Sequence, residues 1–212
     1  MDEHLLSFDN DKTYVFIDCE TENLCLNGVH NLPWQIAMLK VKNSRKIDEK
    51  NYFVSWGREL SVSKEAAKIT RFNPVSHRKK AVPFEDVFPT INDWLTNCDY
   101  IVGHNLLGFD IYLIKDFYNH EGKSYHFLMN KIVDTYCIAK GIQMGVKYKP
   151  SESFLEYQYK ILNTKKRGLR TRLVTLGKNY DIPHDYDKLH DAIVDLELNL
   201  KVWNKLKYQI EL

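Results

Sequence analysis

Four carboxylates and one histidine stand in three short segments of this chain. The segments are Asp18-Cys19-Glu20, residues 103–110 (Gly-His-Asn-Leu-Leu-Gly-Phe-Asp) and residues 190–195 (His-Asp-Ala-Ile-Val-Asp). Acidic side chains that meet inside a folded domain repel one another and lose hydration, so a cation is needed to hold them together. If the fold brings the three segments side by side, their carboxylates form a site for divalent metal ions.

Asp18 and Glu20 follow an apolar run at residues 14–17 that is rich in strand-forming residues. Side chains alternate along a strand, so Asp18 and Glu20 point to one face and Cys19 points to the other. The Asp-x-Glu pattern is common, and two unrelated acids at an exposed strand end would give the same sequence. The position directly after a strand favours a site, because binding sites are built where strands end.

Asp110 lies where a helix is expected to start, shortly after a strand at residues 100–103. Such an aspartate could act as the helix N-cap. The turn at residues 103–105 could also bring Asp110 beside Asp18. We expect His104 and Asn105 to brace this turn through hydrogen bonds rather than bind metal.

His190 and Asp195 are five residues apart and would diverge by about 140° on one continuous helix. Both can face one site only if His190 lies in the turn before the helix and Asp195 lies one turn inside it. Asp191 is then expected to be the N-cap of this helix.

The elements that must position these residues follow from hydrophobic periodicity. Strands are predicted at residues 13–19, 34–41, 52–56, 100–103 and 131–133. Helices are predicted at residues 63–69, 83–95, 109–118, 135–140 and from about residue 191. Three strands followed by alternating helices and strands indicate a mixed α/β layer fold.

Composition limits the class of protein. The 212 residues are 44% hydrophobic and 27% charged, which is typical of one globular domain. A net charge of +2 excludes a strongly cationic coat. Four cysteines without CxxC spacing are expected to be reduced thiols. Neither a signal peptide nor a membrane-spanning run is expected, so we predict a soluble cytoplasmic protein.

The segment at residues 146–172 has eight basic residues against two glutamates, with four aromatic residues between them. Cations among aromatic rings suit single-stranded nucleic acid, which offers phosphates and base faces. An exposed helix and loop, with buried tyrosines and solvated lysines, would have the same composition. The sequence leaves both interpretations open.

The three chemistry-bearing segments resemble the motifs of the DEDDh family of 3′–5′ exonucleases. This family includes the epsilon proofreading subunit of bacterial replicative DNA polymerase and stand-alone relatives. Residues 16–21, 103–110 and 190–195 are similar to its first, second and third motifs, and the likeness extends from about residue 12 to 207. It implies a ribonuclease H-like three-layer fold, with a mixed five-stranded sheet flanked by helices. Residues 1–212 would form a single exonuclease domain with a basic and aromatic insertion at about 146–172.

The resemblance also implies roles for individual residues. Two divalent cations, Mg²⁺ or Mn²⁺, would be held by Asp18, Glu20, Asp110 and Asp195, with Asp18 between them. His190 would be the general base. The substrate-binding residues that the likeness suggests are Thr21, Asn23, Leu24, Ile69, Thr70 and Asn105.

Two departures from the family pattern concern the backbone. Many members have glycine shortly after the first motif, where this chain has Glu22 and Asn23, and we expect Asn23 to adopt a left-handed backbone there. The second motif has three residues between Asn105 and Phe109, whereas many relatives have two.

The predicted function is a metal-dependent 3′–5′ exonuclease that releases nucleoside 5′-monophosphates from single-stranded DNA, in proofreading or end trimming. Its partners would be DNA 3′ ends, contacted through Lys165, Lys166 and Arg167, and a separate DNA polymerase. An exonuclease of RNA or oligoribonucleotides is the alternative within the same chemistry. A catalytically inactive nucleic-acid-binding module is the alternative from another class.

Overall fold

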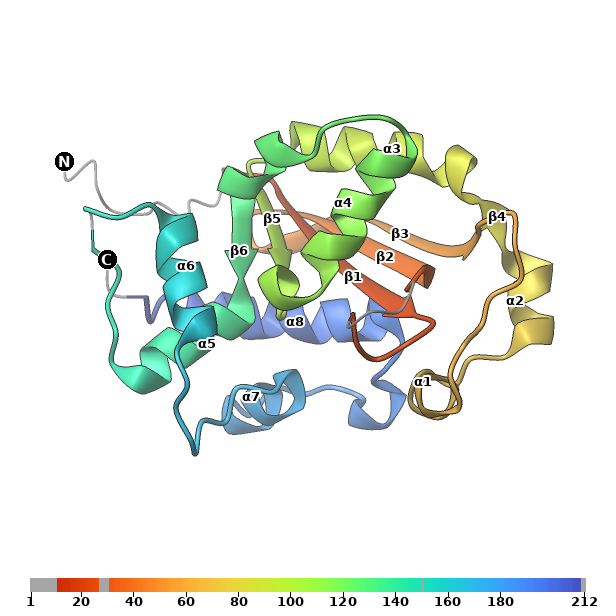
Figure 1. Cartoon of the computed structure of the whole chain (residues 1–212). Helices are drawn as coiled ribbons and strands as arrows, with labels where there is room; N and C mark the ends of the chain where they lie inside the picture. The colour runs from red at the N-terminus through yellow and green to blue at the C-terminus, as the bar shows by residue number, and fades with distance from the viewer. Residues whose placement is uncertain (1–10, 27–30, 150, 211–212) are drawn as a thin grey trace.

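The computed structural model describes residues 11–26, 31–149 and 151–210 (Figure 1). A six-stranded mixed sheet forms its centre, in the order β4-β3-β2-β1-β5-β6. The strands are β1 (Tyr14–Thr21), β2 (Pro33–Lys42), β3 (Arg45–Ser55), β4 (Val82–Pro83), β5 (Tyr100–Gly103) and β6 (Ile132–Asp134). β1 runs antiparallel to β2 and parallel to β5. The α/β layer prediction is confirmed, and the two-residue β4 is added to the five expected strands.

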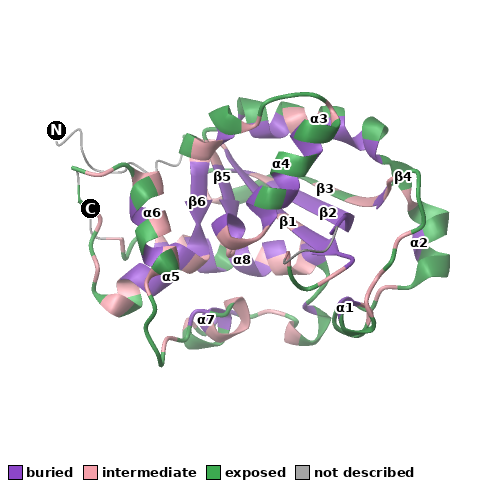
Figure 2. Ribbon diagram, in the orientation of Figure 1, coloured by how far each residue is buried: buried purple, intermediate pink, exposed green. Residues whose placement is uncertain are grey.

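Helices cover both faces of the sheet (Figures 1 and 2). On one face, Val15 and Ile17 of β1 pack with α3 (Phe84–Asn97) and α4 (Asp110–His120). On the other face, Phe16 packs with α8 (Ala192–Leu206). Because alternate side chains of β1 enter two separate cores, the strand is buried from both sides and fixed at the middle of the molecule.

The described residues form five further α-helices and three 3₁₀ turns. They are α1 (Lys64–Thr70), α2 (Pro74–Lys80), α5 (Thr135–Met144), α6 (Phe154–Asn163) and α7 (Leu173–Asn179), with 3₁₀ turns η1 (Leu106–Gly108), η2 (His126–Lys131) and η3 (Tyr186–Lys188). Among the described residues, no helix has the length and apolar character needed to cross a bilayer.

Two of these helices begin at signals that the sequence prediction did not use. α2 starts with Pro74 at its first position, after Asn73, whose side chain accepts a hydrogen bond from the Ser76 N–H at 2.9 Å. α6 starts with a capping box in which Ser153 and Glu156 exchange hydrogen bonds of 2.7 and 3.1 Å. The segment at 146–172 therefore contains a well-defined helix.

Candidate active site

Three of the predicted carboxylates meet beside the end of β1. One oxygen each from Asp18, Glu20 and Asp195 lie within 4.8 Å of one another. Asp18 and Glu20 project from the same face of β1, and Asp195 comes from the start of α8, which packs on that face. Residues separated by more than 170 positions are therefore brought into one cluster by the contact between α8 and β1.

Asp110 joins this cluster from α4. It is the first residue of the helix, and the N-cap position belongs to Phe109, so the N-cap interpretation of Asp110 is wrong. The side chain is 4% exposed, and its Oδ1 has no hydrogen-bond partner among the described residues. Its charge raises the pKa of both Asp18 and Glu20, which places it beside them.

The pKa values of all four carboxyl groups are raised. Burial is the largest cause in each case, and repulsion from neighbouring carboxylates adds to it. The pKa of Asp18 lies well above its usual range, that of Glu20 rises to about 9, that of Asp110 to about 7 and that of Asp195 to about 6. The raised pKa values mean that the charged forms of these groups are disfavoured, and a nearby cation would favour them.

The donor set fits hard divalent cations. All four side chains offer carboxylate oxygens, which suit Mg²⁺ and Mn²⁺ better than softer metals. The unpartnered Oδ1 of Asp110 is a buried acceptor without a donor in the described part of the protein. A bound cation would satisfy this oxygen and relieve the repulsion in the cluster.

His190 lies where the spacing argument placed it, in the turn before α8. Asp191 is the N-cap, and its side chain accepts from the Ile193 N–H, as predicted. His190 has a left-handed backbone with φ of +69°, and its N–H faces both carboxylate oxygens of Asp195 at 3.3 Å. Burial and then the charge of Arg71 lower the pKa of the imidazole. The ring is therefore neutral near pH 7 and able to accept a proton.

Gln35 of β2 anchors this turn to the sheet, a role that the sequence did not reveal. Gln35 stands directly opposite Glu20 in the β1–β2 pairing. Its amide donates to Asp191 at 2.9 Å and to Asn51 at 3.0 Å. The cross-strand neighbour of Glu20 thus fixes the start of α8, which carries Asp195.

The turn between β5 and α4 is braced as expected for His104 and differently for Asn105. The His104 ring lies 3.0 Å from the hydroxyl of Thr135, and its burial lowers its pKa to about 4. Asn105 is held through its main-chain N–H, at 2.9 Å from Asp134. Its side chain lies against Gly108, where a Cβ would come within 2.4 Å of Oδ1. The longer second motif is accommodated by η1.

The loop after β1 does not use the left-handed backbone expected at Asn23. Positive φ angles of the described residues do not include Asn23. The Asn31 side chain accepts from the Asn23 N–H at 2.9 Å and donates to its carbonyl at 3.0 Å, and the Thr21 hydroxyl donates to the same carbonyl at 2.6 Å. The side chains of Asn31 and Thr21 therefore fix the loop at Asn23.

Two clefts adjoin His190. The smaller, of about 370 Å³, is lined by Thr70, Arg71, Phe72 and Lys188 among others, and the larger, of about 620 Å³, by Asn105, Tyr136, Arg172 and Asp195 among others. Thr70 is buried, whereas Leu24 and Ile69 are 50% and 38% exposed. The structure thus places two of the predicted substrate-binding residues in clefts beside His190 and two on open surface.

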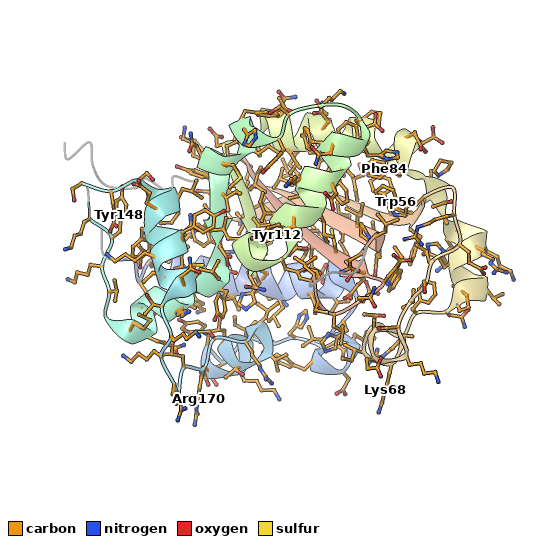
Figure 3. The ribbon with its side chains drawn as sticks, in the orientation of Figure 1. Trp56, Lys68, Phe84, Tyr112, Tyr148 and Arg170 are labelled. Carbon is orange, nitrogen blue, oxygen red and sulfur yellow. The ribbon has the colours of Figure 1, made fainter. Side chains whose placement is uncertain are left out.

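The basic loop between α6 and α7 is anchored near the larger cleft. Lys165, Lys166 and Arg167 are exposed in this loop. Gln143 binds the main chain of Arg170 at both its N–H and its carbonyl, at 2.8 and 3.0 Å. Figure 3 shows Arg170 at the edge of the molecule below α5. Arg172, at the end of this loop, lines the cleft that contains Asp195.

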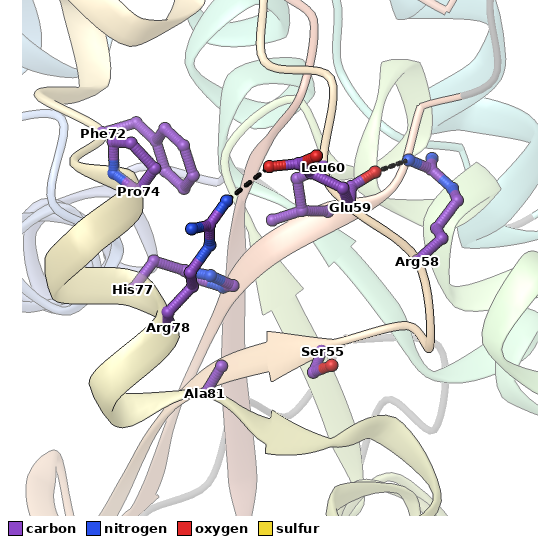
Figure 4. Close-up of a pocket in the computed structure, with 9 residues that line it drawn as sticks. All are labelled: Ser55, Arg58, Glu59, Leu60, Phe72, Pro74, His77, Arg78 and Ala81. Atoms are coloured by element: carbon purple, nitrogen blue, oxygen red, sulfur yellow. Dashed lines mark hydrogen bonds and ion pairs between the residues drawn. The ribbon is translucent and has the colours of Figure 1, made fainter.

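A third cavity, of about 290 Å³, lies between α2 and residues 55–60 (Figure 4). Its arginines are already engaged. Arg78 pairs with Glu59, and Arg58 binds the Glu59 carbonyl and the buried carboxylate of Glu22. The cavity therefore lies where α2 is joined by an ion pair to the loop after β3.

Comparison with known proteins agrees with this geometry. The family model for exonucleases, RNase_T, matches residues 15–203. The chain is 24% identical over 205 residues to the PolC-type DNA polymerase III of Mycoplasma pneumoniae, which covers 95% of this chain and 12% of that protein.

Solved structures of Escherichia coli Exonuclease I show the same fold. The complex with a dT13 oligonucleotide is 18% identical, with a TM-score of 0.69, and covers 94% of this chain and 42% of that one. The complex with dA16 is 17% identical, with a TM-score of 0.72, and covers 94% and 41%. A zinc-bound complex with single-stranded DNA is 19% identical, with a TM-score of 0.70 and the same coverage. The predicted ribonuclease H-like fold is thus confirmed, and the chain spans less than half of these proteins.

Proposed function

This chain belongs to the RNase_T exonuclease family, and from that premise we propose that it hydrolyses single-stranded DNA from the 3′ end. The products would be nucleoside 5′-monophosphates. The observation that carries the proposal is the convergence of Asp18, Glu20 and Asp195, with Asp110 beside them, as buried or half-buried carboxyl groups with raised pKa values next to a neutral histidine. The oligonucleotides in the Exonuclease I complexes support single-stranded DNA as the substrate class.

The carboxylates would hold two divalent ions, Mg²⁺ or Mn²⁺. Asp18, Glu20 and Asp195 would hold one ion. Asp110 would hold the second ion together with Asp18. When bound, the ions would polarise the scissile phosphate and lower the pKa of the attacking water. The fold already holds one oxygen each of Asp18, Glu20 and Asp195 within 4.8 Å of one another, which supports a shared ion among these three.

His190 would accept the proton of the attacking water. Its lowered pKa keeps the imidazole neutral at physiological pH, which a general base requires. The hydrogen bond from its main chain to Asp195 ties the base to a metal ligand. Base and ligand would therefore move as one unit at the start of α8.

The terminal nucleotide would lie against the residues around the β1 loop and α1. These are Thr21, Asn23, Leu24, Ile69 and Thr70, with Asn105 across the site. The exposed side chains of Leu24 and Ile69 suit contact with a sugar or base, and α1 is tied to the β1 loop by the hydrogen bond from the Ser63 N–H to the Glu22 carbonyl at 2.8 Å.

Proofreading with a separate DNA polymerase is a second candidate role. It is supported by the likeness to a PolC-type polymerase, in which the matching stretch is 12% of a larger protein. Co-purification of the chain with a polymerase, and a lower error rate when both are present, would test this role.

The experiment for the main proposal is parallel digestion of single-stranded DNA, duplex DNA and RNA, each labelled at either end, with Mg²⁺ or Mn²⁺. The 3′-labelled strand should release a labelled mononucleotide at once, while the 5′-labelled strand shortens stepwise. Chelation should stop both reactions, and the matched Asp18→Asn variant should be inactive. Faster digestion of RNA would favour the ribonuclease alternative. Release of the 5′ label first, or activity without metal, would overturn the proposal.

A further inference from the structure

The carboxylate of Asp134 joins two parts of the site. Asp134 is fully buried at the end of β6. It accepts hydrogen bonds from the N–H groups of Asn105 and Leu107, both at 2.9 Å, in the turn between β5 and α4. It also caps α5 by accepting from Tyr136 at 2.9 Å and Cys137 at 3.4 Å. One side chain therefore satisfies main-chain donors from two separate elements.

The turn that Asp134 holds leads directly to Asp110. Leu107 lies in η1, and three residues later Asp110 begins α4. Oδ1 of Asp110 has no partner among the described residues, and the carboxylate is otherwise faced by the main-chain N–H groups of Asp110 itself and of Cys19 in β1. Its position therefore depends on how the turn before α4 is held against β1. A Cβ at Gly103 would lie 2.9 Å from Leu106 and 3.3 Å from the Ile17 carbonyl, so the turn is packed closely against β1.

Asp134 is supported in turn by α6. The Gln158 side chain is fully buried, accepts from the Asp134 N–H at 2.6 Å and donates to the Ile132 carbonyl at 2.9 Å. Since β6 is the edge strand of the sheet, Gln158 provides hydrogen bonds that a further strand would make. Lys140 adds a contact from α5 to the Leu162 carbonyl at the end of α6, at 3.0 Å. Figure 1 shows α6 lying beside β6.

We propose that Asp134 and Gln158 are positioning residues that orient Asp110 and thereby set the affinity of the metal ion it holds. The inference rests on the proposed metal site and extends it to α6. Neither interpretation of the segment at 146–172 included this role. In the proposal, the buried Gln158 of α6 supports the metal site through Asp134. Partners of metal ligands typically contribute about 10- to 100-fold to metal affinity or activity.

The test is Mn²⁺ binding, measured by calorimetry and by the electron paramagnetic resonance of free Mn²⁺, in the whole protein. In Asp134→Asn, one oxygen can still accept from Asn105 and Tyr136, but an NH₂ group would face the Leu107 N–H. In Gln158→Leu, both amide contacts are lost at similar volume. We expect each variant to bind Mn²⁺ about 10- to 100-fold more weakly, while saturating Mn²⁺ restores most of kcat.

Gln143→Leu is the matched control. Gln143 clamps the main chain of Arg170 through both amide atoms, as Gln158 clamps β6, but it has no hydrogen bond to the turn before Asp110. Its Mn²⁺ affinity should equal that of the wild type. A loss equal to that of Gln158→Leu would overturn the proposal, because the effect would then be general.

A double-mutant cycle with Asp110→Asn tests the route. If Asp134 acts through Asp110, Asp134→Asn should not weaken Mn²⁺ binding further in the Asp110→Asn background. The same loss in both backgrounds would overturn the proposal, as would unchanged affinity in both single variants. If Asp134→Asn does not fold, Gln158→Leu takes its place in the cycle with Asp110→Asn, and the same two outcomes apply. Absence of Mn²⁺ binding in the wild type would instead remove the proposed function itself.

Discussion

Glu20 and Glu22 are two residues apart and both are buried, with 8% and 1% of their surface exposed, yet their pKa values move in opposite directions. Burial raises the pKa of Glu22, but hydrogen bonds from Arg58, Ser61 and Leu32 outweigh it, and the net pKa is lowered. The pKa of Glu20 rises to about 9 through burial and the charges of Asp195 and Asp110. The protein supplies the Arg58 cation for Glu22, whereas the charged neighbours of Glu20 are further carboxylates.

The difference separates a structural acid, Glu22, from Glu20, which we propose as a metal ligand. Glu22 accepts two guanidinium hydrogen bonds from Arg58, at 2.8 and 2.7 Å, and one from the Ser61 N–H at 2.6 Å. It holds the loop after β1 in place without any external partner. The cluster around Glu20 is incomplete until a cation binds, so folding and metal binding are linked there. Burial alone does not identify a site, whereas burial without a counter-charge does.

The largest expected effect is on activity. Asp18→Asn removes the carboxylate at the centre of the cluster, and Mn²⁺-dependent release of mononucleotides should fall about a thousandfold or more, equivalent to about 4 kcal/mol. The same change relieves repulsion, so the metal-free variant should melt at a higher temperature than the metal-free wild type. Undiminished turnover in the purified variant would contradict the metal-site assignment.

The second prediction concerns the structural pair. Arg58→Ala leaves Glu22 buried without its counter-charge, and we expect a loss of about 2–3 kcal/mol in the free energy of unfolding, measured by denaturant titration. Arg58 is partly exposed, so the loss should lie at the low end for a broken buried pair. Excess Mn²⁺ should not restore this loss. Equal stability of variant and wild type would show that Glu22 needs no partner.

The third prediction is the pH dependence of the metal-free protein. Folded Glu20, Asp110 and Asp195 have raised pKa values, so the folded state retains protons that the unfolded chain releases. The contribution of this cluster to the free energy of unfolding should therefore fall as pH rises from about 4 towards 9. The buried His104 ring, whose pKa is lowered to about 4, acts in the opposite direction in the lower part of this range, but it is one group against three. Between pH 5.5 and 8 the loss should be at least about 1.4 kcal/mol, which lowers the melting temperature by about 3 °C or more.

Saturating Mn²⁺ should remove or reverse this trend, because the ion favours the deprotonated carboxylates. Asp195→Asn is the control that removes one of the titrating groups, and it should flatten the pH dependence in chelator. A melting temperature that rises between pH 5.5 and 8 without metal would contradict the account of the cluster.

The parts of the molecule that the sequence predicted are those determined locally. The apolar residues of β1 and β5 form strands because they are buried between two helical layers. The placement of His190 before α8, with Asp191 as the N-cap, followed from helix geometry and one capping side chain. These features depend on residues close together in the chain, so periodicity and capping were sufficient.

The missed features depend on distant partners. The first half of β3 is exposed and lacks apolar alternation, and it is a strand because β2 pairs with it along its length. Gln35 and Gln158 carry no periodic signal, and their roles arise from contacts with residues 156 and 24 positions away. The capping box at Ser153 was readable, but the basic composition of the segment drew attention instead.

The smallest expected effect concerns the basic residues of the loop between α6 and α7. Lys165, Lys166 and Arg167 make no ion pair within the described residues, so they resemble the acidic cluster in lacking an internal partner. Replacing all three by glutamine should weaken binding of long single strands about tenfold and reduce the salt dependence by about 0.7 per lost phosphate contact. Dinucleotide turnover should remain unchanged, because a dinucleotide need not reach this loop.

The matched control replaces Lys42, Arg45 and Lys205 by glutamine. These cations lie at the far end of the sheet, where Tyr14 rather than Glu20 pairs with β2, and at the end of α8 away from Asp195. Both triple variants lose the same net charge, so a general electrostatic effect would weaken long strands equally in the two. A loss confined to the 165–167 variant would show that the unpaired charge at this loop is neutralised by the bound strand, as the unpaired charge at Glu20 would be by a metal ion.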